Sequence, residues 1–248
     1  SVGGGALAAG VICECIASRF MAHDSIKRLL QEDNIHHRET PLSYRFITKF
    51  YYPLALMSLL SLAVHPLVTF FVGKSRFALE SLAVLPVINS LVFIFRSPGI
   101  SYLEAVVALM GKRKTHYQEL RHFAWLLGTA VVGGLMLIAF TPLAPLWFRQ
   151  VAGLSHELAS FAYLPTQLMT ALPGLMVFIS FQRGCLVSST NTTPITWATI
   201  IEVGTIIGVL FISIKYLDFI GTAAVACAFT MGSLLSNLYL FIYRSRKI

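Results

Sequence analysis

The chain alternates between long apolar stretches and short polar connections. An apolar stretch of about twenty residues forms a helix long enough to cross the roughly 30 Å hydrocarbon core of a bilayer. After an apolar run slightly short for a span, Val2–Ala17, the sequence predicts six spans: Phe50–Val72, Leu82–Met110, Phe123–Trp147, Leu158–Phe181, Ile195–Ile214 and Phe219–Tyr243. The predicted fold class is therefore an all-α, polytopic transmembrane helical bundle.

The pattern predicts three parts. Residues 1–18 are expected to be the truncated end of one further transmembrane helix, and residues 50–248 a six-helix lobe. Between them, residues 19–49 form a long polar linker, with apolar residues that predict either a short interfacial helix or a solvated linker helix. A six-helix lobe after a long loop is typical of the second half of a twelve-helix transporter. We therefore expect an N-terminal six-helix lobe, missing from this sequence, as its partner.

The composition confirms the membrane class. Hydrophobic residues make up 56% of the chain and charged residues only 12%, with a mean hydropathy of +0.73, whereas soluble domains are about 25% charged. A β-barrel is excluded because its strands would alternate apolar and polar residues over short segments. The four cysteines lie in or beside apolar runs and lack zinc-ligand spacing, so we interpret them as core residues.

The net charge is +8, and the basic residues are distributed unevenly between the two sides of the predicted membrane spans. Lysines and arginines number fourteen on the side of the linker and four on the other side. By the positive-inside rule, the linker and the C-terminus are cytoplasmic. The sequence thus predicts an integral protein of the inner or plasma membrane, surrounded by membrane lipid, with no nucleic-acid partner.

The sequence gives no support for an enzyme. It contains no Walker A loop, no GxSxG, no HExxH and no paired-carboxylate motif on a soluble domain. We predict neither a metal site nor a cofactor.

The most informative chemistry lies in the span Leu82–Met110, which carries Arg96 and Glu104. A charge at mid-bilayer costs about 2.5–3.5 kcal/mol on insertion scales, so such residues usually face a polar cavity. In a straight helix the two are about 12 Å apart along the axis. We expect Pro98-Gly99 to bend or unwind the helix so that both reach one cavity. The alternative is a structural ion pair or capping arrangement.

Other polar residues in apolar stretches are weaker candidates for substrate or ion binding. Glu14 could face a cavity or extend to water, and His65, beside Pro66, is either a proton-coupling group or a satisfied core histidine. Asn89 and Glu202 complete the candidate set.

Three further features of the spans are predicted. Pro173-Gly174 should break its span, as Pro66 should kink its own. Arg183 is expected to be an interfacial anchor, with a role as a ligand as the alternative, and Asn237 an interhelical hydrogen-bonding residue.

Several short motifs resemble one known superfamily. They are Phe50–Leu56 after the basic linker, Ser97-Pro98-Gly99 with Glu104, Gln182-Arg183-Gly184 to Thr192-Thr193 at the expected turn between two helices, Gly221–Ala224, and Gly4–Ala9. Together they resemble the C-terminal lobe of the multidrug/oligosaccharidyl-lipid/polysaccharide (MOP) exporters, which are MATE-like. The nearest likeness is to the progressive ankylosis protein family and its bacterial relatives.

The resemblance implies a V-shaped pair of six-helix bundles that works by alternating access, as in antiporters driven by H⁺ or Na⁺. Ankylosis-type members are associated with export of phosphate-containing or carboxylate anions, and flippase-type members with lipid-linked sugars. The first-lobe coupling acids have no counterpart in this sequence. We therefore predict a secondary active transporter, present as a fragment, that exports a small organic anion or an amphipathic solute. The alternatives are a flippase for a lipid-linked saccharide and a non-transporting membrane scaffold or regulatory subunit.

Overall fold

The computed structural model of the protein describes residues 2–33, 44–110, 116–189 and 192–245. The chain divides into two compact units, residues 1–47 and residues 48–248. The first unit contains the helix α1 (Val2–Asp33), which runs past the predicted helix end at Ala17. Because residues 18–33 contain no glycine and no proline, nothing stops the helix there. The expected short linker helix is thus a continuation of α1.

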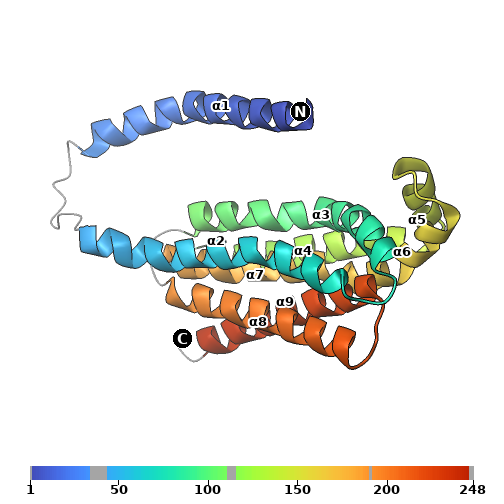
Figure 1. The fold of residues 1–248 in the computed structure, drawn as a ribbon. Helices are drawn as coiled ribbons and strands as arrows, with labels where there is room; N and C mark the ends of the chain where they lie inside the picture. Colours follow the sequence, from blue (N-terminus) through green and yellow to red (C-terminus); the bar gives the residue numbers. More distant parts are fainter. Residues whose placement is uncertain (1, 34–43, 111–115, 190–191, 246–248) are drawn as a thin grey trace. The chain divides into compact units, whose positions relative to one another are not determined.

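The second unit begins inside α2 (Tyr44–Val72) and contains all later elements. Its long helices, shown in Figure 1, are α3 (Ala78–Leu109), α4 (Tyr117–Phe140), α6 (His156–Leu168), α7 (Leu172–Ser188), α8 (Thr193–Lys215) and α9 (Gly221–Ser245). Short pieces connect α4 to α6, namely α5 (Leu143–Pro145) and the π-helix η1 (Leu146–Val151), and the 3₁₀ turn η2 (Met169–Ala171) joins α6 to α7.

The predicted fold class and span number are confirmed. Within the described residues, six helical segments are long and apolar enough to cross a membrane, with α6, η2 and α7 together forming one of them. The predicted end of the third span was wrong, because α4 ends at Phe140 and not at Trp147. Thr141 is extended, and the proline after it begins a turn with no amide hydrogen to continue the helical ladder.

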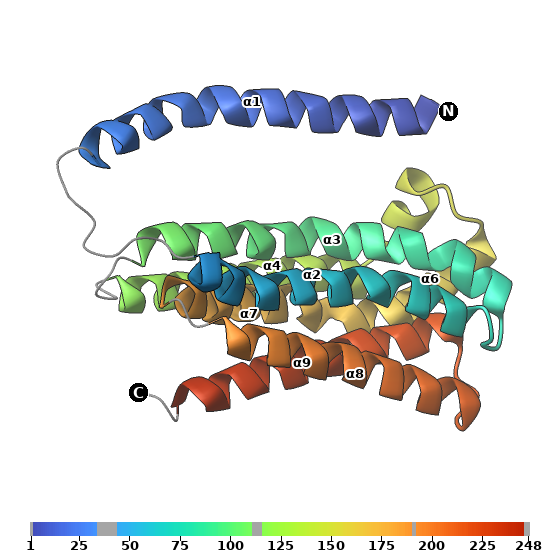
Figure 2. The ribbon, with the colours of Figure 1, turned by 60° about the vertical axis from the view of Figure 1, so that its left-hand side comes forward.

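The long helices of the second unit run side by side, and α7 lies at the centre of their packing (Figure 2). It contacts α3, α4, α8 and α9, and its buried residues point in several directions around the helix. The largest core cluster joins residues of α2, α3, α6, α8 and α9. α7 is thus placed to present different faces to different parts of the lobe.

The prolines act differently in different spans. The expected break at Pro173-Gly174 is confirmed, since η2 interrupts the span just before them and Pro173 lies in the first turn of α7. Pro98-Gly99 was expected to bend or unwind α3; it does not unwind it, since the helix is continuous from Ala78 to Leu109. Pro98 deprives the carbonyl of Ile94 of its usual amide donor, and the hydroxyl of Ser97 donates to that carbonyl at 2.9 Å instead. α2 is likewise helical through Pro66.

Two glycines bring α3 and α7 into close contact. A Cβ on Gly99 of α3 would lie 3.0 Å from the backbone nitrogen of Val177, and a Cβ on Gly184 of α7 would lie 2.5 Å from Cγ1 of Val106. The contact at Gly184 is closer than a real Cβ atom allows, and the contact at Gly99 is tighter than most real Cβ contacts. This close approach sets the positions of the polar residues that α3 and α7 carry.

Candidate functional site

A cavity of about 330 Å³ lies inside the second unit, between α2, α3, α7, α8 and α9. Its walls are largely apolar, yet polar side chains from all five helices reach it. We call it the polar cavity, and its polar lining residues are Ser61, His65, Asn89, Arg96, Arg183, Thr199, Glu202 and Ser233. A mostly apolar pocket with a few convergent polar groups is the usual form of a small-molecule site.

One wall of the polar cavity is organised around Glu202 of α8. Arg183 of α7 places Nη2 3.4 Å from Oε2 of Glu202, and the two side chains are only 15% and 22% exposed. The hydroxyl of Ser233 of α9 donates to Oε1 of the same carboxylate at 3.0 Å. Arg183 also donates to Oγ1 of Thr199 at 3.4 Å. The carboxylate therefore holds three helices together and is compensated within this wall.

Arg96 of α3 lies across the cavity and differs from Arg183. Among the residues that the structure describes, its Nη2 has only the sulfur of Met176 as a partner, at 3.9 Å, and its buried Nε, like that of Arg183, has no hydrogen-bond partner. In the part of the chain that the structure describes, no carboxylate lies within 4.0 Å of this guanidinium. Two guanidinium groups and one carboxylate leave the cavity one positive charge in excess. Donors of this kind, in a site with few competing groups, favour an anion.

The structure brings together four of the six predicted candidates. His65, Asn89, Arg96 and Glu202 all line the polar cavity. His65 is exposed at its wall, which differs from the satisfied core histidine that was the alternative interpretation. Their roles in binding stay predictions.

The other two candidates lie elsewhere. Glu104 is exposed on α3 and does not line the polar cavity, so the expectation that it shares a cavity with Arg96 was wrong. Because α3 is continuous, Glu104 stays about 12 Å farther along the helix and on another face. Glu14 is exposed on α1, in the first unit.

Sequence reasoning misjudged Arg183 and missed Ser233. The predicted span ended at Phe181, which put Arg183 at an interface, whereas α7 continues to Ser188 and buries it. The motif Gln182-Arg183-Gly184, expected at a turn, is thus inside a helix. Helical spacing was the available signal, since Arg183 follows Met176 by seven residues, on the same face of the helix.

Asn237 behaves as predicted. Its amide nitrogen donates to the carbonyl of Leu175 at 3.0 Å, and its Oδ1 accepts from Gln182 at 3.0 Å, both on α7. Among the residues described, no group of three or more His, Cys, Asp and Glu side chains could hold a metal ion. The lining of the polar cavity thus offers hydrogen bonds and charge.

Comparison with known proteins identifies the fold. No family model and no curated protein matches the sequence. Two solved structures match. One is a MOP superfamily transporter from Pyrococcus furiosus, whose binding pocket of reverse polarity suggests a different function, with a TM-score of 0.59. The other is a MATE protein in complex with MaL6, with a TM-score of 0.63.

Each of these two structures shares 17% sequence identity with the chain, and the match covers 79% of the chain. It covers only 43% of the transporter in both cases, so the chain spans less than half the length of either protein. Identity at this level shows the fold alone. The chain is an integral membrane protein whose bundle has the fold of a MATE-like lobe, as found in transporters of the MOP superfamily.

Proposed function

We propose that the chain forms the C-terminal lobe of a secondary active transporter, which exports a small organic anion or an amphipathic solute by alternating access. The observation that carries this proposal is the polar cavity, in a lobe of transporter fold, where Arg96 has no carboxylate partner among the described residues. In this proposal a preceding six-helix lobe supplies the opposite wall of the path, because transport sites of this architecture lie between two repeats.

The charge of the polar cavity supports an anionic substrate. Arg183 already has Glu202 at 3.4 Å, so its charge is compensated. Within the described part of the chain, Arg96 has a weak sulfur contact but no carboxylate within 4.0 Å, and its buried Nε, like that of Arg183, has no partner. A buried donor without a partner costs about 1–3 kcal/mol, which a carboxylate or phosphate oxygen would recover on binding. The binding site thus gains stability when an anion arrives.

The size of the polar cavity supports a small anion or the charged end of a larger amphipathic molecule. Its volume of about 330 Å³ is at the lower end of the range for small-molecule sites, roughly 300–1,000 Å³. Asn89 and His65 add hydrogen-bonding groups on α3 and α2, away from the pair of Arg183 and Glu202. These two side chains would orient the substrate once Arg96 has bound its anionic group.

The orientation and energy source belong to the proposal as well. The distribution of lysine and arginine supports a cytoplasmic linker and C-terminus in an inner or plasma membrane. Export would then draw on an inward gradient of H⁺ or Na⁺.

Transport by the full-length protein in proteoliposomes tests the proposal. The probes are radiolabelled succinate and carboxyfluorescein, each followed under an imposed proton gradient and under an imposed sodium gradient. We expect gradient-driven movement of at least one anion, with an initial rate about tenfold lower in Arg96→Gln, which corresponds to about 1.4 kcal/mol. Glu104→Gln is the matched control because this residue is charged, lies on the same helix and is outside the cavity.

Three results would reject the proposal or part of it. An unchanged rate in Arg96→Gln would remove this residue from the path. Movement of a lipid-linked saccharide, without movement of either anion, would favour a flippase. Absence of any gradient-driven transport by a folded protein would favour a scaffold or regulatory subunit.

A further inference from the structure

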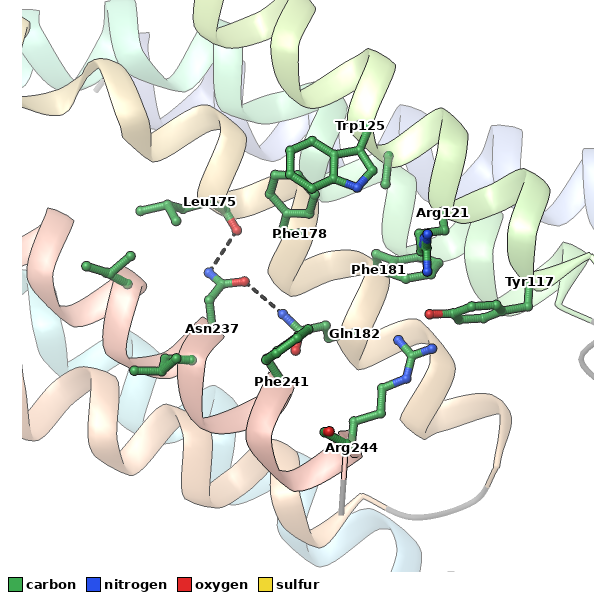
Figure 3. Close-up of a pocket in the computed structure, with 14 residues that line it drawn as sticks. Tyr117, Arg121, Trp125, Leu175, Phe178, Phe181, Gln182, Asn237, Phe241 and Arg244 are labelled. Carbon is green, nitrogen blue, oxygen red and sulfur yellow. Dashed lines mark hydrogen bonds between the residues drawn. The ribbon is translucent and has the colours of Figure 1, made fainter. Parts of the chain in front are cut away.

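A second cavity, of about 710 Å³, lies between α4, α7 and α9 (Figure 3). It shares no lining residue with the polar cavity. The two lie on different faces of α7, since Leu175, Phe178 and Gln182 line the second cavity, whereas Met176, Ile179 and Arg183 line the first. We call the second one the basic-aromatic pocket.

Two arginines and several aromatic rings gather at one end of this pocket. Figure 3 shows Arg121 of α4, Tyr117 of α4 and Arg244 of α9 close together there. The guanidinium of Arg244 lies 4.4 Å from the ring centre of Tyr117 and 5.4 Å from that of Phe181. In the described parts of the chain, neither arginine has a carboxylate within 4.0 Å. As far as the described residues go, this end of the pocket therefore carries two positive charges and no carboxylate at ion-pair distance.

The rest of the pocket is largely apolar and extends along the helices, with Gln182 and Asn237, which hydrogen-bond to each other at 3.0 Å, as its polar lining residues between the two ends. Its lining on α9 runs from Leu234 to Ser245, about 16 Å at the helical rise of 1.5 Å per residue. That length is about half of a bilayer's hydrocarbon core, or one leaflet. Trp125 packs edge-on against Phe178, with ring centres 4.7 Å apart, and is itself 58% exposed. The pocket thus has a cationic end and an apolar wall that is open to the outside of the lobe.

We propose that the basic-aromatic pocket binds an anionic phospholipid. The headgroup phosphate lies between Arg121 and Arg244, and an acyl chain runs along the apolar wall past Phe178 and Leu234. Arginine forks match the geometry of phosphate oxygens, and clustered basic groups at the membrane surface select anionic headgroups. The side on which the two arginines lie is the one for which the positive-inside rule predicts the cytoplasm, where anionic lipids are concentrated.

A soluble anion fits this pocket less well than a lipid does. A small anion would use the two arginines and leave most of the volume of about 710 Å³ unfilled. An acyl chain covers the apolar wall, which removes it from contact with water at the level of the headgroups. The chain then extends into the surrounding bilayer. The arrangement of charge at one end and apolar surface along one leaflet is that of a phospholipid itself.

Quenching of tryptophan fluorescence by brominated lipids tests the proposal on the full-length protein. Trp125 lines the pocket, so a brominated lipid bound there quenches it. We expect brominated phosphatidylglycerol to quench at about tenfold lower concentration than brominated phosphatidylcholine with the same chains. The quenching that comes from Trp125 should be absent in Trp125→Phe, where only the other tryptophans contribute fluorescence.

Variants of Arg121 and Arg244 test whether these two residues confer the preference for an anionic lipid. Arg121→Gln and the double variant Arg121→Gln/Arg244→Gln should abolish the preference for phosphatidylglycerol. Arg121 is exposed and makes no ion pair in the described residues, so its variant remains informative even if loss of Arg244 disturbs the aromatic packing. Lys215→Gln is the matched control, because this lysine also lies beside an aromatic ring, at 5.0 Å from Phe211, but ends α8 at the opposite end of the lobe.

Several outcomes would overturn the proposal. Equal quenching of the wild type by the two lipids would show that the pocket does not select anionic headgroups. A preference retained in the double variant would show that the two arginines do not confer it. Displacement of the lipid by soluble glycerol phosphate at similar concentration would show that the pocket recognises a free phosphate compound.

Discussion

The pair of Arg183 and Glu202 should stabilise the lobe more than a surface ion pair does. Glu202→Gln leaves the guanidinium of Arg183, only 15% exposed, without its carboxylate at 3.4 Å. Removing one partner of a fully buried pair costs roughly 3–5 kcal/mol, whereas exposed pairs contribute about 0.2–1 kcal/mol. Because Glu202 is 22% exposed, the cost lies between these limits, at about 2 kcal/mol.

A double-mutant cycle measures this coupling. The free energy of unfolding of the full-length protein is determined by titration with sodium dodecyl sulfate in mixed micelles, for Glu202→Gln, Arg183→Gln and the double variant. We expect the double variant to be less destabilised than the sum of the single variants by about 1–2 kcal/mol, because it removes both charges of the pair and leaves neither without its partner. The exposed pair of Arg76 and Asp218, 4.0 Å apart, is the control and should show almost no coupling. Coupling no larger than in that control would refute the role assigned to the pair.

Two further predictions concern packing around the site and use the same unfolding assay. Gly99→Ala should destabilise the lobe by about 1–3 kcal/mol, because the new Cβ meets the backbone of Val177. Gly133→Ala is the control, since a Cβ there has nothing within 4 Å, and it should be neutral or stabilising. Similar effects at both positions would contradict the close contact at Gly99. Tyr102→Phe should cost about 1 kcal/mol through loss of its hydrogen bond to the carbonyl of Leu120, at 2.5 Å, and an unchanged stability would contradict that bond.

The sequence predicted the spans well because length and hydropathy alone decide whether a helix can cross a membrane. The same physics identified His65, Asn89, Arg96 and Glu202, since polar groups in apolar helices are costly unless they face a polar environment. Three helices, α2, α3 and α8, bring these four residues to one cavity. Which helix faces which depends on close contacts such as that of Gly99 with Val177, and a single sequence does not reveal such contacts.

The errors have identifiable causes. Glu104 was assigned to the cavity because Pro98-Gly99 was expected to bend or unwind α3, but the hydroxyl of Ser97 compensates the freed carbonyl of Ile94, and the helix continues. Arg183 was assigned to an interface because the apolar run ends at Phe181. The carboxylate of Glu202, on another helix, offsets the cost of burying the charge of Arg183, and only the three-dimensional structure shows that the two side chains meet.

Reversal of the charge at Arg96 tests most directly whether the polar cavity binds the substrate. Arg96→Glu changes the excess of one positive charge to an excess of one negative charge. In proteoliposomes with the full-length protein, the ratio of carboxyfluorescein transport to ethidium transport should fall by at least tenfold relative to the wild type, while Glu104→Arg leaves the ratio unchanged. An unchanged ratio in Arg96→Glu, in a protein that still transports, would contradict an anion site in the polar cavity.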